Sequence, residues 1–416
     1  MGLAMDHVVK CRFCGHSVRH TFVDLGMSPL CETYITSEQL NHMEPFYPLH
    51  AYVCERCFLV QLEEFVAPGH IFSEYAYFSS YADSWVEHAR QYCELMCERF
   101  GIDRSSRVVE IASNDGYLLQ YFQKKGIPVL GVEPAQNVAK AAVRKGIPTV
   151  TKFFGLRTAA ELKAEGKQAD LIVANNVLAH VSDLVDFVRG LELLLKPAGT
   201  ITVEFPHLLR LMEGNQFDTI YHEHFSYFSF GTAEEIFRKY GLEIFDVEEL
   251  PTHGGSLRMY ARHPGAATQP VSTRVSSFRE QEISAGLRDL AAYASFGEKV
   301  RETKRALLEF LVRAKRTGKS VAAYGAAAKG NTLLNYCGIR TDFLDYAVDL
   351  SPHKQNLFLP GTHIPVHSPE KLRETRPDYV LILPWNIRDE ILHQHAYIRE
   401  WGGRFVVPIP TVEVIS

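Results

Sequence analysis

The chain has 416 residues, which is enough for two or three domains that each bury a core of their own. Hydrophobic residues make up 46% and charged residues 22%, an ordinary balance for a globular protein that excludes a disordered or fibrous chain. The formal net charge is −5, no apolar run approaches the length of a membrane span, and residues 1–10 lack the apolar stretch of a signal peptide. We therefore expect a cytoplasmic protein with no nucleic-acid or membrane partner.

Four of the eight cysteines form two pairs with the same spacing, Cys11-Arg-Phe-Cys14 and Cys54-Glu-Arg-Cys57. Each Cys-x-x-Cys pair is a zinc knuckle, and the two knuckles together supply four thiolates. This is the donor set of a closed, structural zinc site with no position open for catalysis. A redox role is disfavoured because neither pair opens a helix after a strand. Cys93 and Cys97 lie four residues apart in an expected helix, and we interpret them as packing residues.

A helix is expected over 84–100, and an alternation of strands and helices then continues to about residue 260. This alternation indicates a parallel sheet covered by helices on both faces, with ligands at the carboxyl ends of the strands. The expected strands are 107–111, 128–133, 170–174 and 200–204, and the expected helices are 117–125, 137–145 and 184–195.

From about residue 272 the pattern changes to a long helical connection over 276–316, broken near 295–297. Strands at 320–324, 344–349 and 379–383, with a turn at 325–329 and a helix at 331–336, then predict a second Rossmann-like domain. The predicted architecture is α/β with three units. They are a zinc-binding domain at 1–68, a Rossmann-like domain at 69–271, and the helical connection with a C-terminal Rossmann-like domain at 272–416.

The turn after the first strand reads Glu110-Ile-Ala-Ser-Asn-Asp-Gly116, and the next strand ends in Glu133. A carboxylate at this second position suits a ribose diol, but the turn lacks the three glycines that cradle a pyrophosphate. An acidic residue at the end of the first strand instead favours a ligand with positive charge. The sulfonium and amino groups of S-adenosylmethionine fit that requirement, and an ordinary strand-to-helix turn is the structural alternative.

Several segments, in order along essentially the whole chain, resemble the sugar C-methyltransferases of deoxysugar biosynthesis. They are the two knuckles, the turn 110–116, Ala174-Asn-Asn-Val-Leu-Ala-His180, Phe217-Asp-Thr-Ile-Tyr-His-Glu-His-Phe225 and Tyr324-Gly-Ala-Ala-Ala-Lys-Gly330. The resemblance implies an enzyme that uses S-adenosylmethionine and one structural zinc ion to methylate C3 of a nucleotide-linked 4-keto-6-deoxyhexose, with dTDP as the expected nucleotide. Two positions depart from the family: Ala112 replaces Gly, and His222 replaces Asp.

The resemblance and the position of the strand ends together predict the residues that contact the cofactor. The expected cofactor-binding residues are Glu110, Ala112, Asn114, Gly116, Glu133, Pro134, Asn175 and Asn176.

Carbon–carbon bond formation with a sulfonium methyl donor needs a carbanion equivalent, and an enolate next to a ketone is the simplest one. Forming it calls for a general base and a hydrogen-bond donor to the oxyanion. In the run Tyr221-His-Glu-His224 we expect His224 to remove the C3 proton, Glu223 to orient it and Tyr221 to contribute a hydroxyl. We expect His180 to face the C4 oxygen.

Each of these assignments has a structural alternative. The run 221–224 is also explained by a polar loop, and His180 by a core histidine with one satisfied nitrogen. Metal binding by His222 and His224 ranks below the base role, because alternating positions of a strand would face one side with no third ligand nearby.

The expected substrate contacts come from three further segments. The resemblance puts a tyrosine of 74–80 in the active site, and aligning the Ser-Ser pair assigns this role to Tyr75, with Tyr77 as its neighbour; a packed aromatic linker is the alternative. Glycines in 252–256 permit a close backbone approach to a ligand, although a tight turn explains them nearly as well. The turn at 325–329 presents helix amides and a lysine to a phosphate, so we expect the C-terminal domain to hold the diphosphate and nucleoside. The expected contacts are Tyr77, His253, Gly254, Tyr324, Gly325, Lys329, Lys354 and Asn356, with Gln355 and Asn386 as weaker candidates.

Two other functions remain open at this stage. One is methylation at oxygen or nitrogen of a nucleotide sugar, which needs a base but no adjacent ketone. The other is a zinc-knuckle binding module with degenerate βα domains, for which the acidic net charge and the lack of a Lys/Arg stripe beside the knuckles disfavour nucleic acid.

Overall fold

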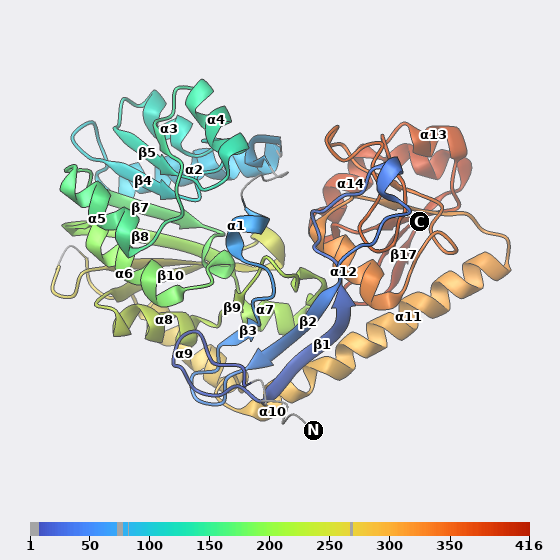
Figure 1. Cartoon of the computed structure of the whole chain (residues 1–416), viewed down its shortest axis with the longest axis horizontal. Helices are drawn as coiled ribbons and strands as arrows, with labels where there is room; N and C mark the ends of the chain where they lie inside the picture. Colours follow the sequence, from blue (N-terminus) through green and yellow to red (C-terminus); the bar gives the residue numbers. More distant parts are fainter. Residues whose placement is uncertain (1–7, 73–77, 82, 267–268) are drawn as a thin grey trace.

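The computed structural model describes residues 8–72, 78–81, 83–266 and 269–416, so the predicted site residues Tyr75 and Tyr77 lie outside the described residues. The chain forms a four-stranded, a seven-stranded and a six-stranded sheet (Figure 1). The predicted α/β class, with a small N-terminal unit and two Rossmann-like units, is confirmed. The limits at residues 68 and 271 stay a prediction. Within the described ranges, no helix combines the length and apolar character needed to cross a membrane.

The N-terminal unit is an antiparallel sheet of order β1-β2-β3-β9, whose last strand comes from a distant part of the chain. Its elements are β1 (His20–Ser28), η1 (Ser37–Gln39), β2 (Tyr47–Val53), β3 (Val60–Leu62) and β9 (Ser226–Tyr227), with α1 (Pro68–Ile71) and η2 (Ser79–Tyr81) following along the chain. The first knuckle precedes β1, and the second joins β2 to β3. Because β9 directly follows the run 217–225, its pairing with β3 holds that run against the zinc-binding unit.

The middle unit is a seven-stranded sheet of order β10-β11-β8-β7-β4-β5-β6. The interior strand β4 is buried at every position, as a parallel strand covered on both faces must be. The predicted strands and helices of this unit correspond to β4, β5, β7, β8, α2, α3, α4 and α6. The elements are α2 (Asp83–Phe100), β4 (Val108–Ile111), α3 (Leu119–Lys124), β5 (Val129–Val132), α4 (Gln136–Arg144), β6 (Thr149–Val150), α5 (Leu156–Ala164), β7 (Ala169–Asn175), η3 (Leu178–His180), α6 (Leu184–Leu194), β8 (Leu195–Pro206), α7 (Leu208–Glu213), η4 (Phe217–Thr219), α8 (Phe230–Lys239), β10 (Glu243–Leu250), η5 (Thr252–Gly254) and β11 (Ser256–Arg262).

The four predicted strands, β4, β5, β7 and β8, are parallel as expected, and two antiparallel strands lie at one edge of the sheet. β11 runs antiparallel to β8, and β10 runs antiparallel to β11. The physical reason is the connection between β10 and β11, which spans only residues 251–255. A connection this short joins antiparallel neighbours, whereas parallel neighbours need a crossover of a dozen residues or more.

The C-terminal unit is a six-stranded sheet of order β14-β13-β12-β15-β16-β17, parallel except for β17. The predicted helical connection is present and breaks at Ser295, with a further break over 285–289. The elements are α9 (Thr273–Ser284), α10 (Leu290–Ala294), α11 (Phe296–Arg316), β12 (Val321–Tyr324), α12 (Ala328–Cys337), β13 (Ala347–Val348), β14 (Val366–His367), α13 (Lys371–Thr375), β15 (Tyr379–Ile382), η6 (Trp385–Ile387), α14 (Arg388–Gln394), η7 (Ala396–Trp401), β16 (Arg404–Val407) and β17 (Glu413–Ile415).

The N-terminal unit shares a hydrophobic core with each of its neighbours. The cysteines of the knuckles pack into the core of the seven-stranded sheet, whereas the strands β1, β2 and β3 pack into a second core with α11 and the C-terminal sheet. Figure 1 shows α11 running beneath β1 and on to the C-terminal unit. The small unit therefore bridges the two Rossmann-like units and brings their strand ends to face one another.

Candidate active site

The four predicted zinc ligands converge. The Sγ atoms of Cys11, Cys14, Cys54 and Cys57 all lie within 4.8 Å of one another, and three of these cysteines are buried. Four thiols at this separation fit a tetrahedral structural zinc ion. Elsewhere in the described chain, no other group of three or more histidine, cysteine or acidic side chains is arranged to hold a metal, so a metal at His222 and His224 has no support.

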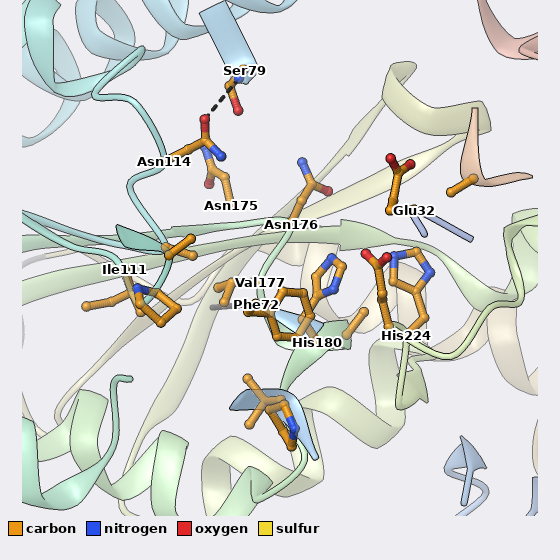
Figure 2. A pocket seen from close by; sticks show the side chains of 18 of the residues that line it. Glu32, Phe72, Ser79, Ile111, Asn114, Asn175, Asn176, Val177, His180 and His224 are labelled. Carbon is orange, nitrogen blue, oxygen red and sulfur yellow. Dashed lines mark hydrogen bonds between the residues drawn. The ribbon is translucent and has the colours of Figure 1, made fainter. Parts of the chain in front are cut away.

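The three units enclose a cavity of about 740 Å³ at the carboxyl ends of the seven-stranded sheet. Figure 2 shows part of its lining, from Ile111 and Asn114 on one side to His224 and Glu32 on the other. Most of the site residues predicted from the sequence face this one space. They are Ala112, Asn114, Glu133, Pro134, Asn175, Asn176, His180, Tyr221, Glu223, His224, His253, Lys329, Lys354 and Asn386.

Two predicted cofactor residues lie outside the cavity lining. Glu110 is buried beneath it, where burial and then the nearby Asp115 and Glu133 hold the pKa of its carboxyl well above the usual range. Gly116 has a φ of +76°, and a Cβ there would lie 2.9 Å from Cγ1 of Ile147. The structure therefore explains Gly116 by backbone conformation and packing.

Four predicted substrate contacts also lie outside the lining. Gly254 packs against Trp385 across the interface between units, where a Cβ would lie 2.6 Å from the indole ring. Gly325 packs against Pro384, and a Cβ at Gly325 would lie 2.5 Å from Cδ of that proline. The ring of Tyr324 packs 4.6 Å from that of His395. The backbone amide of Asn356 donates to the carbonyl of Val366 in the C-terminal unit.

On the cofactor side, Glu133 lies at the end of β5 and its two oxygens accept from the backbone amides of Asn114 (2.9 Å) and Ala135 (2.8 Å). Burial raises the pKa of the Glu133 carboxyl to about 7. Asn114 in turn accepts a hydrogen bond from the amide of Ser79, drawn in Figure 2, and so ties η2 to this wall.

Asn175 ends β7, Asn176 follows it, and the side chains of both have polar atoms without hydrogen-bond partners. Neither the amide nitrogen nor the oxygen of either side chain has a hydrogen-bond partner in the part of the chain that the structure describes. Buried amides are costly without partners, so a polar ligand at this wall is expected to satisfy them. Together with Glu133, these groups fit the amino acid and ribose portions of S-adenosylmethionine.

At the centre of the cavity, Nδ1 of His224 donates a hydrogen bond to the carbonyl oxygen of Thr219 at 2.9 Å. This contact puts the proton of the neutral ring on Nδ1 and leaves a lone pair on Nε2. Burial, followed by the nearby His180, holds the pKa of His224 well below its ordinary value, so the ring is uncharged at neutral pH. The ring centroid lies 4.1 Å from that of Tyr221 and 4.7 Å from that of His180.

His180 is uncharged in this setting. Burial lowers its pKa to about 4, although a hydrogen bond to the backbone of Glu223 acts in the opposite direction. Its Nδ1 has no hydrogen-bond partner among the described residues. Nδ1 of His180 can donate a hydrogen bond to a substrate oxygen only when this nitrogen carries the proton of the ring. The hydroxyl of Tyr221, whose pKa burial holds well above 10, stays protonated and is a ready donor.

His222 points away from this cluster. Its Nε2 contacts the carbonyl of Pro48 at 3.2 Å, and its ring lies against Tyr47. The expectation that His222 and His224 alternate along a strand is wrong, because η4 and a turn precede β9. The turn sends the two imidazoles in different directions, and the departure from Asp at position 222 does not affect the cavity lining.

The C-terminal side of the cavity is the first turn of α12, with Ala327, Ala328 and Lys329. Nζ of Lys329 donates to Oδ1 of Asn386 at 2.7 Å, and burial lowers its pKa. Nζ of Lys354 donates to the carbonyl of Ala326 at 2.8 Å. A helix start with two lysines beside it is suited to an anion.

Sequence reasoning missed Glu32 and Trp85, which also line the cavity. Trp85 was visible only as one apolar position of a helix, but its ring lies 5.3 Å from that of His253 and 4.8 Å from that of His88. Glu32 stands in the loop between the knuckles, where no motif or periodicity marked it. Trp85 meets His253 from a distant segment of the same unit, and Glu32 reaches the site from the N-terminal unit, so neither contact leaves a local signal.

Comparisons with known proteins agree with this arrangement. Three family models match in order: "Putative zinc binding domain" at residues 11–72, "Methyltransferase domain" at 85–247 and "C-methyltransferase C-terminal domain" at 251–410. The chain is 38% identical to the C-methyltransferase NovU of Streptomyces niveus over 98% of its own length and 97% of that protein. A ubiquinone biosynthesis O-methyltransferase of Rhizobium etli is 29% identical over 26% of this chain and 46% of its own. A solved magnesium protoporphyrin IX methyltransferase from Synechocystis, with bound S-adenosylmethionine, overlaps 43% of this chain and 81% of its own with a TM-score of 0.33 and 15% identity.

The order of domains, the four-cysteine cluster and the cavity at the strand ends define a zinc-containing methyltransferase that depends on S-adenosylmethionine. Within this class the chain belongs to the C-methyltransferase family that includes NovU. The predicted family and the predicted cofactors, S-adenosylmethionine and zinc, are thereby confirmed.

Proposed function

We propose that the chain methylates C3 of a nucleotide-linked 4-keto-6-deoxyhexose, with dTDP as the nucleotide, by way of an enolate. The observation that supports this most is the buried, uncharged imidazole of His224, whose Nε2 keeps its lone pair because Nδ1 carries the ring proton and donates a hydrogen bond to the carbonyl of Thr219. It lies in one cavity with unsatisfied amides on one side and a helix start with lysines on the other.

S-adenosylmethionine supplies an electrophilic methyl group when it is bound, and Glu133, Asn175 and Asn176 are the residues proposed to hold it. His224 Nε2 takes the proton from the carbon next to the C4 ketone. The imidazolium that forms is unfavourable in this buried setting until the enolate charge develops beside it, so proton transfer and charge separation stabilise each other. The enolate carbon would displace S-adenosylhomocysteine from the methyl carbon, so that the C–C bond forms as the C–S bond breaks and the ketone is restored.

The oxygen at C4 is proposed to accept a hydrogen bond from the hydroxyl of Tyr221, and from His180 whenever His180 carries a proton on Nδ1. Glu223 is buried next to both histidines and is proposed to orient them. Tyr75, which the family resemblance assigns to the active site, lies outside the described residues and stays a prediction.

The nucleotide diphosphate is proposed to bind at the start of α12. The backbone amides of the first turn point out of the helix, and Lys329 adds a positive charge there. Lys354 and Asn386 stand on the same wall. The nucleoside is proposed to lie further along the C-terminal unit.

The deciding experiment is hydrogen exchange at the sugar in deuterated water without the methyl donor. Incubation with dTDP-4-keto-6-deoxyglucose should introduce deuterium at C3, because only the enolate route makes that hydrogen exchangeable. Deuterium at C5, the other carbon next to the ketone, would instead indicate that the enolate forms toward C5 and that C5 is the methylated carbon. Methyl transfer without exchange at either carbon would favour methylation at oxygen or nitrogen, and mass spectrometry of the product locates the methyl group.

A control for the cofactor is calorimetry with S-adenosylhomocysteine. Micromolar binding is expected of the enzyme. No binding at millimolar ligand would favour a zinc-knuckle binding module with degenerate βα domains.

A further inference from the structure

Glu32 is a carboxylate in the cavity that the proposed proton transfer does not use. It comes from the loop between β1 and β2 of the N-terminal unit and is the residue of that loop that lines the cavity. Figure 2 shows it near His224 and well away from Ile111 and Asn114. Its Oε2 has no hydrogen-bond partner in the described part of the chain, and Nζ of Lys354 is 3.9 Å from it, beyond hydrogen-bond distance.

A buried carboxylate oxygen without a hydrogen-bond donor is costly, because it loses its hydrogen bonds to water, and the ion pair with Lys354 at 3.9 Å offsets only part of this loss. Burial accordingly raises the pKa of Glu32, although Lys354 opposes the shift. The neighbouring hydroxyl of Tyr34 does not relieve the cost at Oε2, because it donates to the carbonyl of Ala326 at 2.6 Å. A bound molecule that brings a hydrogen-bond donor to Oε2 of Glu32 would relieve this cost.

Glu32 stands between the two ends of the proposed substrate site. On one side is His224, which Figure 2 shows near Glu32 and whose ring lies 4.1 Å from that of Tyr221. On the other side is Lys354, which is bonded to the carbonyl of Ala326 next to the first turn of α12. In a nucleotide-linked hexose the diphosphate is attached to C1 and the proposed reacting carbon is C3, so C2 is the ring carbon between these two ends.

From this juxtaposition we propose that Glu32 accepts a hydrogen bond from a hydroxyl at C2 of the sugar, and so selects hexoses that keep this hydroxyl over 2-deoxy hexoses. The inference rests on the proposed function and adds the substituent that the site recognises. A carboxylate accepts hydrogen bonds but cannot donate them, which suits a hydroxyl and penalises a bare CH₂ that would leave the charge unpaired. Lys354 offsets the repulsion between this carboxylate and the diphosphate nearby.

The test compares two substrates, dTDP-4-keto-6-deoxyglucose and its 2-deoxy counterpart, in the wild type, Glu32→Gln and Glu32→Ala. For Glu32→Ala we expect kcat/KM to fall about 10- to 100-fold with the 2-hydroxy sugar, as for the loss of a hydrogen bond to a charged group, and to change less than about twofold with the 2-deoxy sugar. Glu32→Gln keeps the size and one acceptor oxygen, so an intermediate loss is expected. The wild type should prefer the 2-hydroxy sugar.

Glu38→Gln is the matched control, because Glu38 is an exposed carboxylate in the same loop. It should leave both substrates unaffected. Calorimetry with S-adenosylhomocysteine checks that each variant is folded. An equal loss on both sugars, no loss on either, or a wild type that prefers the 2-deoxy sugar would overturn the role of Glu32 while the proposed function stands. A wild type that methylates neither sugar would instead remove the proposed function, and the inference with it.

Discussion

The reactivity of His224 depends on a single contact to the backbone, the hydrogen bond from its Nδ1 to Thr219. We predict that His224→Ala lowers kcat by at least about 100-fold, because a general base is lost, while affinity for S-adenosylhomocysteine changes little. Turnover assays and calorimetry measure the two effects separately. His222→Asn is the control, since His222 contacts Pro48 outside the cavity lining, and it should keep most of the activity. Normal turnover in His224→Ala would remove this residue from the base role.

Ala112 adopts a backbone conformation that suits glycine better. Its φ is +56°, in the left-handed region where a Cβ costs about 1–2 kcal/mol. We predict that Ala112→Gly raises the melting temperature or leaves it unchanged, and tightens binding of S-adenosylhomocysteine, because the strain is relieved at the cavity wall.

The control for this variant is Ala135→Gly in the same cavity. Ala135 has a φ of −75°, so glycine there should only add flexibility to the unfolded chain and lower stability. Thermal unfolding and calorimetry of both variants check the contrast. A loss of stability in Ala112→Gly as large as in Ala135→Gly would argue against strain at position 112.

At the scale of elements, the first zinc knuckle contacts the loops that carry His180 and His224 through Arg12. Its Nη1 donates to the carbonyl of Ser182 at 3.0 Å, two residues after His180, and Nη2 donates to the carbonyl of Leu62. Its guanidinium also lies 5.4 Å from the ring of Phe225, the residue after His224. The knuckle thus supports both loops that carry His180 and His224.

We predict that Arg12→Met lowers kcat by about 10-fold with a smaller change in KM, because the loops lose their support while the zinc ligands remain. Cys11→Ser should instead lower stability and soluble yield, because the loss of one of four ligands removes zinc binding energy from folding. Steady-state kinetics, zinc content and thermal unfolding distinguish the two. Arg56→Met, at an exposed position of the second knuckle, is the control. Arg12→Met enzyme with normal kcat would confine the role of Arg12 to folding.

At the scale of the whole molecule, burial of histidines from separate segments makes folding sensitive to acid. Burial lowers the pKa of His253 to about 4 from an ordinary 6.5. Below pH 6.5 the unfolded chain therefore binds a proton that the folded chain does not, and the stability of the folded state falls as pH drops from 6.5 toward 4. Glu133 and Asp218, with pKa values raised to about 7, act in the opposite direction, so one variant must be compared with the wild type.

His253→Asn isolates this contribution, since asparagine tolerates the φ of +54° at this position. We predict that the stability of the wild type relative to this variant falls by up to about 3 kcal/mol between pH 6.5 and pH 4. Urea unfolding at a series of pH values measures the difference. A difference that stays constant over this range would show that His253 titrates normally in the folded chain.

The sequence by itself determined the local features of this protein. The spacing of Cys11–Cys14 and Cys54–Cys57, the alternation that became β4 to β8, and the glycines and acids of the turns all depend on neighbouring residues, so they are readable along the chain. Most of the site residues that it marked line the cavity, because the carboxyl ends of parallel strands must meet at one edge of a sheet.

Only the tertiary structure decided which side chains meet. It turned His224 into the cavity and His222 against Pro48, brought Glu32 from the zinc-binding unit to the proposed substrate site, and paired β11 antiparallel to β8. These outcomes depend on contacts between residues that lie far apart in the chain. Such contacts form, and stabilise the fold, only when the units pack together. No spacing or periodicity within one segment carries that information.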